Sequence, residues 1–160
     1  MKRLEEKTTV YYEVKKSKFI SYLVPIENEE HAKLMIQQIK EEHPKATHHC
    51  VAYRIKSDNV VRFDDDGEPQ HTAGKPMLSV LLAQDLDHVL SVVVRYYGGV
   101  QLGKGGLVKA YTLGVTTAIS ESTFVTLEEI FDLSFDCSFD YAPQIEAYAH
   151  HLHAEVNTNY

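Results

Sequence analysis

The stretch that decides the fold is His88 to Tyr111, which reads HVLSVVVRYYGGVQLGKGGLVKAY. Its first part, His88 to Tyr97, contains the β-branched run LSVVV at 90–94 and is followed by two glycines. This pattern predicts a central strand that is covered on both faces. A glycine-rich turn follows, and then the longest helix of the chain is expected over about 104–121. A buried strand is therefore expected to lead directly into a long helix, and the fold class we expect is α+β.

The expected helix carries a buried stripe at i, i+3, i+4 and i+7 spacing. Within it, Ala110, Gly114 and Ala118 recur every fourth residue and make a smooth face. Gly114 costs about 1 kcal/mol of helix propensity. We therefore expect a sheet to approach this face closely. The stripe consists of Leu107, Ala110, Tyr111, Gly114, Val115 and Ala118.

The other elements are read outward from this stretch. Residues 9–26 predict two extended segments joined by a charged turn at 15–18. Asn28 is a good helix N-cap, and Pro44 stops that helix. Further strands are expected at His48 to Ile55 and at Val60 to Phe63, and Pro76 suits the first turn of another helix.

A second unit is expected from Phe124, which divides the chain into domains 1–123 and 124–160. Apolar and polar residues alternate strictly over 131–140, which predicts a half-exposed strand. Pro143 then opens an amphipathic helix. One strand and one helix cannot make a sizeable core alone. The exposed strand edge would allow self-association.

Composition excludes collagen-like, low-complexity and disordered proteins. The 160 residues are 44% hydrophobic and 24% charged, as in ordinary globular domains. The net charge of −7 argues against bulk attraction to nucleic acid or to an anionic membrane. No signal peptide and no long apolar run is evident, so we expect a cytoplasmic protein without a membrane partner. Two cysteines make no disulfide framework.

Positive charge is concentrated in one segment, because no Asp or Glu occurs from His88 to Ser120. A strand, glycines and a helix N-terminus together offer backbone N–H groups to an anion. Gly98, Gly103 and Lys104 have the spacing of a phosphate-binding loop, G-x-x-x-x-G-K. Gly105 follows, however, where a Ser or Thr would hold magnesium, and this argues against nucleotide hydrolysis. The alternative is that the glycines only allow a tight turn. The candidate anion- or RNA-binding residues are Arg95, Gly98, Gly99, Gly103, Lys104, Gly105, Gly106 and Lys109.

Two other clusters are weaker candidates. The carboxylates at 64–68 with His71 resemble part of a calcium loop but lack its final Glu. They also fit a solvated turn, or acceptors for the N–H groups of the following helix. His48 and Cys50 share one face of a strand, where a thiol is usually a small buried hydrophobe. We therefore predict no catalytic residue, no metal site and no cofactor.

Several motifs in this order resemble the IMPACT family over about residues 10–122. They are HCVAY at 49–53, DDGEP at 65–69, TAGKP at 72–76, VVRYYGG at 93–99 and GGLVKAY at 105–111. The resemblance implies an N-terminal domain with the topology of ribosomal protein S5 domain 2. It also implies that residues 125–160 correspond to the first strand and helix of a ferredoxin-like domain. Eukaryotic relatives regulate translation.

Three functions are compatible with this sequence. The leading hypothesis is a non-enzymatic, translation-related protein that binds RNA or a ribonucleoprotein surface through a groove formed by Arg95, Lys104 and Lys109. The alternative is a binder of, or an enzyme acting on, a small phosphorylated or anionic ligand at the same loop. The third is a protein-interaction module whose polar strand, 130–140, completes a partner's sheet.

Overall fold

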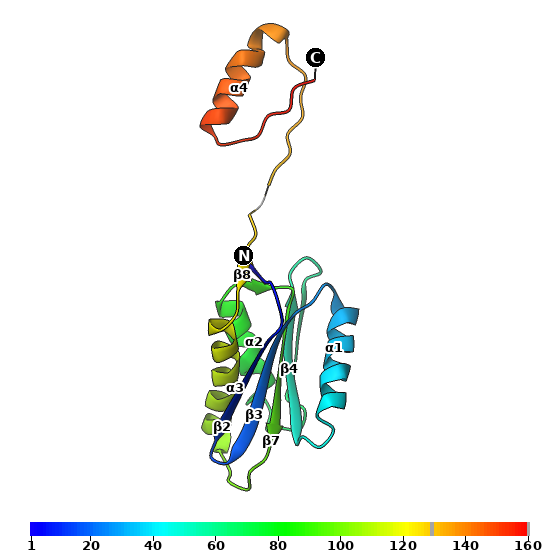
Figure 1. Cartoon of the computed structure of the whole chain (residues 1–160), viewed down its shortest axis with the longest axis vertical. Coiled ribbons are helices and arrows are strands. Elements are labelled where there is room, and N and C mark those ends of the chain that lie inside the picture. Colours follow the sequence, from blue (N-terminus) through cyan, green and yellow to red (C-terminus); the bar gives the residue numbers. More distant parts are fainter. Residues whose placement is uncertain (129, 160) are drawn as a thin grey trace. The chain divides into compact units, whose positions relative to one another are not determined.

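The computed structural model describes residues 1–128 and 130–159, which form two compact units, Met1–Glu128 and Glu129–Tyr160. The fold is mixed α+β, as expected (Figure 1). The first unit contains β1 to β8 and α1 to α3, and the second contains α4. The bounds are β1 Lys2–Leu4, β2 Thr8–Val14, β3 Ser17–Pro25, α1 Glu29–Glu42, β4 His48–Ile55, β5 Val60–Asp64, α2 Gly74–Ala83, β6 Leu86–Asp87, β7 Val89–Tyr96, α3 Gly103–Ser120, β8 Phe124–Thr126 and α4 Ala142–His151.

The predicted central strand is confirmed as β7. It is the middle member of a five-stranded sheet of order β2-β3-β7-β4-β5, in which every neighbouring pair is antiparallel. Helices α2 and α3 cover one face, and α1 covers the other (Figure 1). Val93 packs toward α2 and α3, whereas Val92 and Val94 pack toward α1. Both faces of β7 are therefore covered, which explains the consecutive valines Val92 to Val94.

The predicted turn and cap are confirmed. Lys15 and Lys16 have φ angles of 46° and 65°, so a two-residue turn joins β2 to β3. Positive φ at both central residues gives the turn a twist that matches the strands it connects. Asn28 caps α1, because its side-chain oxygen accepts the N–H of His31 at 2.8 Å.

A second, three-stranded sheet of order β6-β1-β8 lies in the same unit. Strand β1 pairs in parallel with β6 and antiparallel with β8. Residues 124–126 are thereby held by the first unit. The division between the units accordingly falls a few residues later than the sequence indicated, after Glu128.

In the second unit the helix expected after Pro143 is confirmed as α4, and the strand expected over 131–140 is wrong. The described residues 130–138 form no strand. Phe131 and Leu133 are more than four-fifths exposed. A strand is held by hydrogen bonds to a neighbouring strand, and the described part of this unit offers none. The alternation of apolar and polar residues over 131–140 was therefore not sufficient to predict a strand.

The C-terminal end of α1 is tied to the sheet by two tyrosines. The hydroxyl of Tyr22 lies 2.6 Å from Nε2 of His43, and that of Tyr96 lies 2.8 Å from Nδ1. Burial lowers the pKa of His43, an effect that the nearby Glu42 carboxylate opposes and that His49 and Lys7 reinforce. The neutral imidazole, with one donor and one acceptor nitrogen, is the form that this arrangement favours.

We expect this arrangement to make stability depend on pH. In the unfolded chain His43 takes up a proton at a pH of about 6.5, whereas the folded state resists it. As pH falls below about 6.5 the unfolded state binds more protons, so the free energy of unfolding decreases. Urea unfolding at pH 7.5 and 5.5 measures this difference. His43→Gln should make it smaller and exposed His71→Gln should not; equal differences in all three proteins would contradict the assignment.

The close approach expected at Gly114 is confirmed. A Cβ at this position would overlap the Tyr12 hydroxyl. That ring is fixed, because it stacks on Phe19 at 5.0 Å and its hydroxyl donates to the Ala110 carbonyl at 2.9 Å. Glycine is therefore required where α3 crosses β2.

Gly114→Ala should lower the free energy of unfolding by about 1–3 kcal/mol, since an added methyl must displace a packed ring. Gly105→Ala is the matched control, because it lies in the same helix with open space around it. It should leave stability unchanged or raise it by up to about 1 kcal/mol. Urea unfolding of both variants checks the sign, and a stabilising Gly114→Ala would contradict the contact.

Candidate functional site

The glycine-rich loop joins β7 to α3 and lies against the β2–β3 turn. The N–H of Gly98 donates to Oγ of Ser17 at 3.3 Å. A Cβ at position 98 would overlap the backbone carbonyl of Lys16. Gly98 is thus the residue that lets the loop reach the turn. The two segments, distant in the sequence, form one surface.

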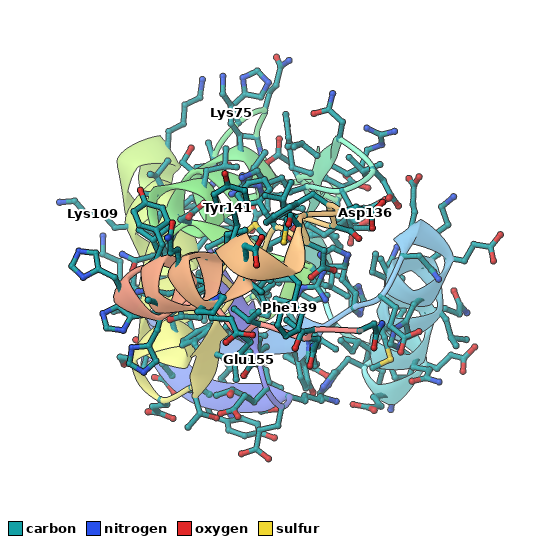
Figure 2. All side chains as sticks on the ribbon, turned by 90° about the horizontal axis from the view of Figure 1, so that it is seen from above. Lys75, Lys109, Asp136, Phe139, Tyr141 and Glu155 are labelled. Carbon is teal, nitrogen blue, oxygen red and sulfur yellow. The ribbon has the colours of Figure 1, made fainter. Side chains whose placement is uncertain are left out.

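The structure does not bring Arg95, Lys104 and Lys109 together. The side chain of Arg95 is only 5% exposed, and Nη1 lies 2.6 Å from Oε1 of Glu68. Lys104 is exposed at the second position of α3. Lys109 lies five residues further on, roughly 140° around the helix, and extends away from it (Figure 2). The groove lined by three cations is therefore absent among the described residues, because Arg95 is used inside the protein.

The remaining glycines open the loop to solvent. A Cβ at Gly99, Gly103 or Gly105 would meet no atom of the described residues within 4 Å, and Gly106 faces Leu102. Gly99 and Gly103 have φ angles of 85° and 72°. No side chain of the described residues caps the first turn of α3. The first N–H groups of this helix therefore lack intrahelical acceptors and lie beside exposed glycines.

Sequence reasoning missed the lysines of the β2–β3 turn. Lys15 and Lys16 are exposed beside the loop, and Lys18 lies opposite Tyr96 in the pairing of β3 with β7. Among the described residues, neither these lysines nor Lys104 has a carboxylate within 4 Å. The hairpin register, combined with the expected central strand, is the signal that points to them. We call the glycine-loop surface the set Lys15, Lys16, Lys18, Tyr97, Gly98, Gly99, Gly103, Lys104 and Gly105.

A buried polar cluster supports this surface from below. Oε1 of Glu68 accepts hydrogen bonds from Nη1 of Arg95 and from the Tyr111 hydroxyl, each at 2.6 Å. Nε and Nη2 of Arg95 lie 3.4 and 3.2 Å from Oγ of Ser17. The guanidinium also lies 5.4 Å from the ring centroid of Tyr97, which is 47% exposed. The internal cation thus holds an aromatic side chain at the surface.

The acidic loop of β5–α2 is structural, which was one of the alternatives for it. Oδ1 of Asp65 accepts the N–H groups of Ala73 and Gly74, and Oδ2 accepts that of His71, at 2.7–3.1 Å. Asp66 accepts the N–H of His49 at 2.6 Å. Within residues 1–128 and 130–159, no group of three or more His, Cys, Asp and Glu side chains is arranged to hold a metal ion.

Cys50 is fully buried, and its Sγ donates to the Asp65 carbonyl at 3.1 Å. Burial raises the pKa of the Cys50 thiol far above its usual range. His48 donates from Nδ1 to the Asp66 carbonyl at 2.7 Å, and its Nε2 lies 3.7 Å from Oε2 of Glu68. The thiol is therefore a packed hydrophobe rather than a nucleophile.

Residues 15–119 match the Impact N-terminal domain, which is about two thirds of the chain. The chain therefore belongs to the IMPACT family. It is 42% identical over 142 residues to the IMPACT family member YigZ of Escherichia coli, covering 87% of this chain and 70% of that protein. An IMPACT family member of Haemophilus influenzae is 48% identical over 132 residues, covering 79% of this chain and 63% of that protein.

A crystal structure of a hypothetical protein has the same architecture. It superposes with a TM-score of 0.76 at 38% sequence identity, covering 99% of this chain and 79% of the other. The resemblance to the family is therefore confirmed by the sequence comparisons. In the described residues, no helix has the length and apolar character needed to cross a membrane.

The buried pair of Arg95 and Glu68 gives a stability prediction. Arg95→Met should lower the free energy of unfolding by about 3–5 kcal/mol, because it leaves a buried carboxylate without its cation. The double variant Arg95→Met with Glu68→Gln should recover part of that loss. Arg62→Met is the control, since Arg62 pairs with Glu29 at the surface at 3.6 Å and should cost less than about 1 kcal/mol. Equal losses for Arg95→Met and Arg62→Met in urea unfolding would contradict this assignment.

Proposed function

We propose that the protein is a non-enzymatic, cytoplasmic member of its family that binds RNA or a ribonucleoprotein surface through the glycine-loop surface. The observation that carries the proposal is a group of exposed lysines without carboxylate partners among the described residues, in a chain of net charge −7. Single-stranded nucleic acid is bound by surfaces that combine lysines with aromatic side chains on which bases stack. Tyr97 supplies such a side chain.

The cations proposed to bind the ligand differ from the set expected from the sequence, which was Arg95, Lys104 and Lys109. Lys15, Lys16, Lys18 and Lys104 contact phosphates, and the open amides of Gly103 and Gly105 add donors. Arg95 acts from inside by holding Tyr97 and the loop in place. Lys109 lies on a different side of α3 and contributes to the general field only.

A role in translation is proposed because the family resemblance implies it. The finer fold names belong to the same proposal. The first unit would have the topology of ribosomal protein S5 domain 2, and the segment that follows it would be the start of a ferredoxin-like domain. Fold kinship alone does not specify a ligand, so the surface itself has to be tested.

Filter binding of a single-stranded RNA oligomer, titrated at several salt concentrations, tests the surface. Few phosphates are contacted, so we expect weak binding that falls with added salt. Lys16→Ala and Lys104→Ala together should lower the slope of log affinity against log salt by roughly 0.7 per lysine. Lys33→Ala on α1, also exposed, is the matched control and should leave the slope unchanged.

Two outcomes would contradict the RNA proposal. One is the absence of measurable RNA binding at low salt, and the other is an equal slope in the double variant and the wild type. The uncapped start of α3 favours a second candidate, a small phosphorylated ligand at Gly103 to Gly105. Saturable thermal stabilisation by nucleotides, without RNA binding, would support that candidate instead.

A further inference from the structure

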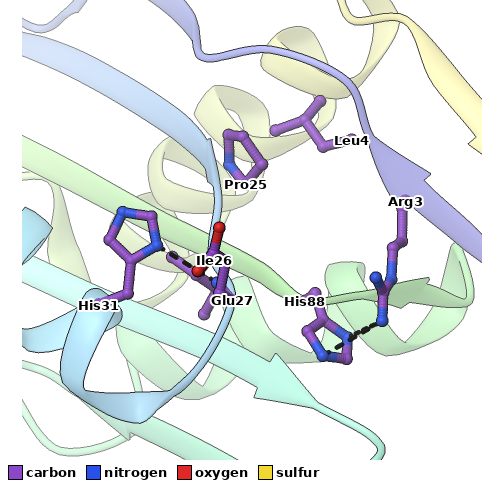
Figure 3. Close-up of a pocket in the computed structure, with 7 residues that line it drawn as sticks. All are labelled: Arg3, Leu4, Pro25, Ile26, Glu27, His31 and His88. Carbon is purple, nitrogen blue, oxygen red and sulfur yellow. Dashed lines mark hydrogen bonds between the residues drawn. The ribbon is translucent and has the colours of Figure 1, made fainter.

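A cavity of about 370 Å³ lies at the other end of the sheet from the glycine loop. Strand β3 begins beside Gly98 at Ser17 and ends at the cavity with Pro25. At about 3.3 Å per residue, the two sites are roughly 25 Å apart. The cavity is lined by Arg3, Leu4, Pro25, Ile26, Glu27, His31 and His88 (Figure 3).

Arg3 is a half-buried cation without a carboxylate partner within 4 Å among the described residues. Its Nη2 lies 2.9 and 3.2 Å from the two ring nitrogens of His88. Its Nε is buried and has no hydrogen-bond partner in residues 1–128 and 130–159. A guanidinium carries five N–H donors, and most of those of Arg3 remain unused by the protein. Arg3 lines the cavity, so donors that the protein leaves unused are available to an anionic ligand there.

The carboxylate of Asp87, the residue opposite Arg3 in the pairing of β1 with β6, already has partners of its own. Its Oδ1 accepts the N–H groups of Lys56 and His88 at 2.7 and 2.8 Å, and its Oδ2 lies 2.9 Å from Nδ1 of His88. Burial raises the pKa of Asp87, but these hydrogen bonds outweigh burial and hold it below its usual range. The carboxylate of Asp87 and the guanidinium of Arg3 thus both lie against the ring of His88, which holds the ring between them.

The opposite side of the cavity carries an acidic residue, Glu27. Figure 3 shows His31 and Glu27 on one side of the cavity, with Arg3 and His88 on the other. The backbone N–H of Glu27 donates to Nδ1 of His31 at 3.3 Å. Within the described part of the chain, no hydrogen bond or ion pair is made to the Glu27 carboxylate, which is exposed. Apolar side chains, namely Leu4, Pro25 and Ile26, complete the wall. The cavity thus presents a cation at one end and an anion at the other, with an apolar wall.

We propose that this cavity binds a small carboxylate with an apolar body and a hydrogen-bond donor, namely an amino or hydroxy acid. The carboxylate lies on the guanidinium of Arg3, whose planar fork matches it. The donor faces Glu27, and the body covers the apolar wall. A phosphate dianion is excluded by the negative charge of Glu27. The volume is at the lower end of the range for small-molecule sites.

Isothermal titration of the full chain with three compounds of one skeleton tests the proposal. The compounds are leucine, 2-hydroxy-4-methylpentanoate and 4-methylpentanoate, with inorganic phosphate as the fourth probe. We expect saturable binding of the first two, at least about threefold weaker binding of 4-methylpentanoate, which lacks the donor, and weaker binding still of phosphate.

Two variants locate the binding. Arg3→Gln should weaken the binding of every carboxylate at least about tenfold, because a charge-assisted bidentate contact is lost. Glu27→Gln, at an exposed position, should keep the fold and remove the preference for leucine over 4-methylpentanoate. Arg62→Gln is the control and should change nothing.

The proposal is overturned if none of the three carboxylates binds saturably, if phosphate binds more tightly than they do, or if Glu27→Gln leaves their order unchanged. Arg3→Gln should retain RNA binding, so failure at this cavity and failure at the glycine-loop surface are distinguishable.

Discussion

The buried carboxylate of Glu68 is the contact on which the rest of the first unit depends. One oxygen of this group accepts from Arg95 on β7 and from Tyr111 on α3, each at 2.6 Å. The β5–α2 loop, the central strand and the longest helix therefore meet at a single atom. A charge that is removed from water must be compensated by close partners, so each of these elements constrains the position of the other two. The DDGEP motif and the arginine of the VVRYYGG motif are two parts of this contact.

This contact also determines what the surface can offer. Because Arg95 is buried, its charge is not presented by the loop that follows β7. The positive charge beside this loop comes instead from the lysines of the β2–β3 turn. Asp65 fixes the start of α2 in the same region by accepting three backbone N–H groups. The acidic residues of the β5–α2 loop are thus used in hydrogen bonds within the protein, whereas the lysines of the β2–β3 turn remain available to a ligand.

The strength of the sequence patterns explains which features were predictable. Strand β7, helix α3 and the Asn28 cap follow from local periodicity and side-chain chemistry, and all were found. The partner of Arg95 was not predictable, because Glu68 lies 27 residues away and a polar residue in a strand looks the same whether it is buried or exposed. The missed lysines depend on the packing of Gly98 against Lys16, which is a tertiary contact. The strand expected over 131–140 failed because alternation describes a face and says nothing about a neighbouring strand.

The position of β7 between β3 and β4 has a consequence for the order of events during synthesis. The β2–β3 and β4–β5 hairpins each consist of contacts between residues close in the chain, so both form quickly as they leave the ribosome. They cannot join until residues 89–96 have emerged, since only β7 pairs with both. Until then the nascent chain carries two half-sheets with unpaired edges, the kind of intermediate that chaperones protect.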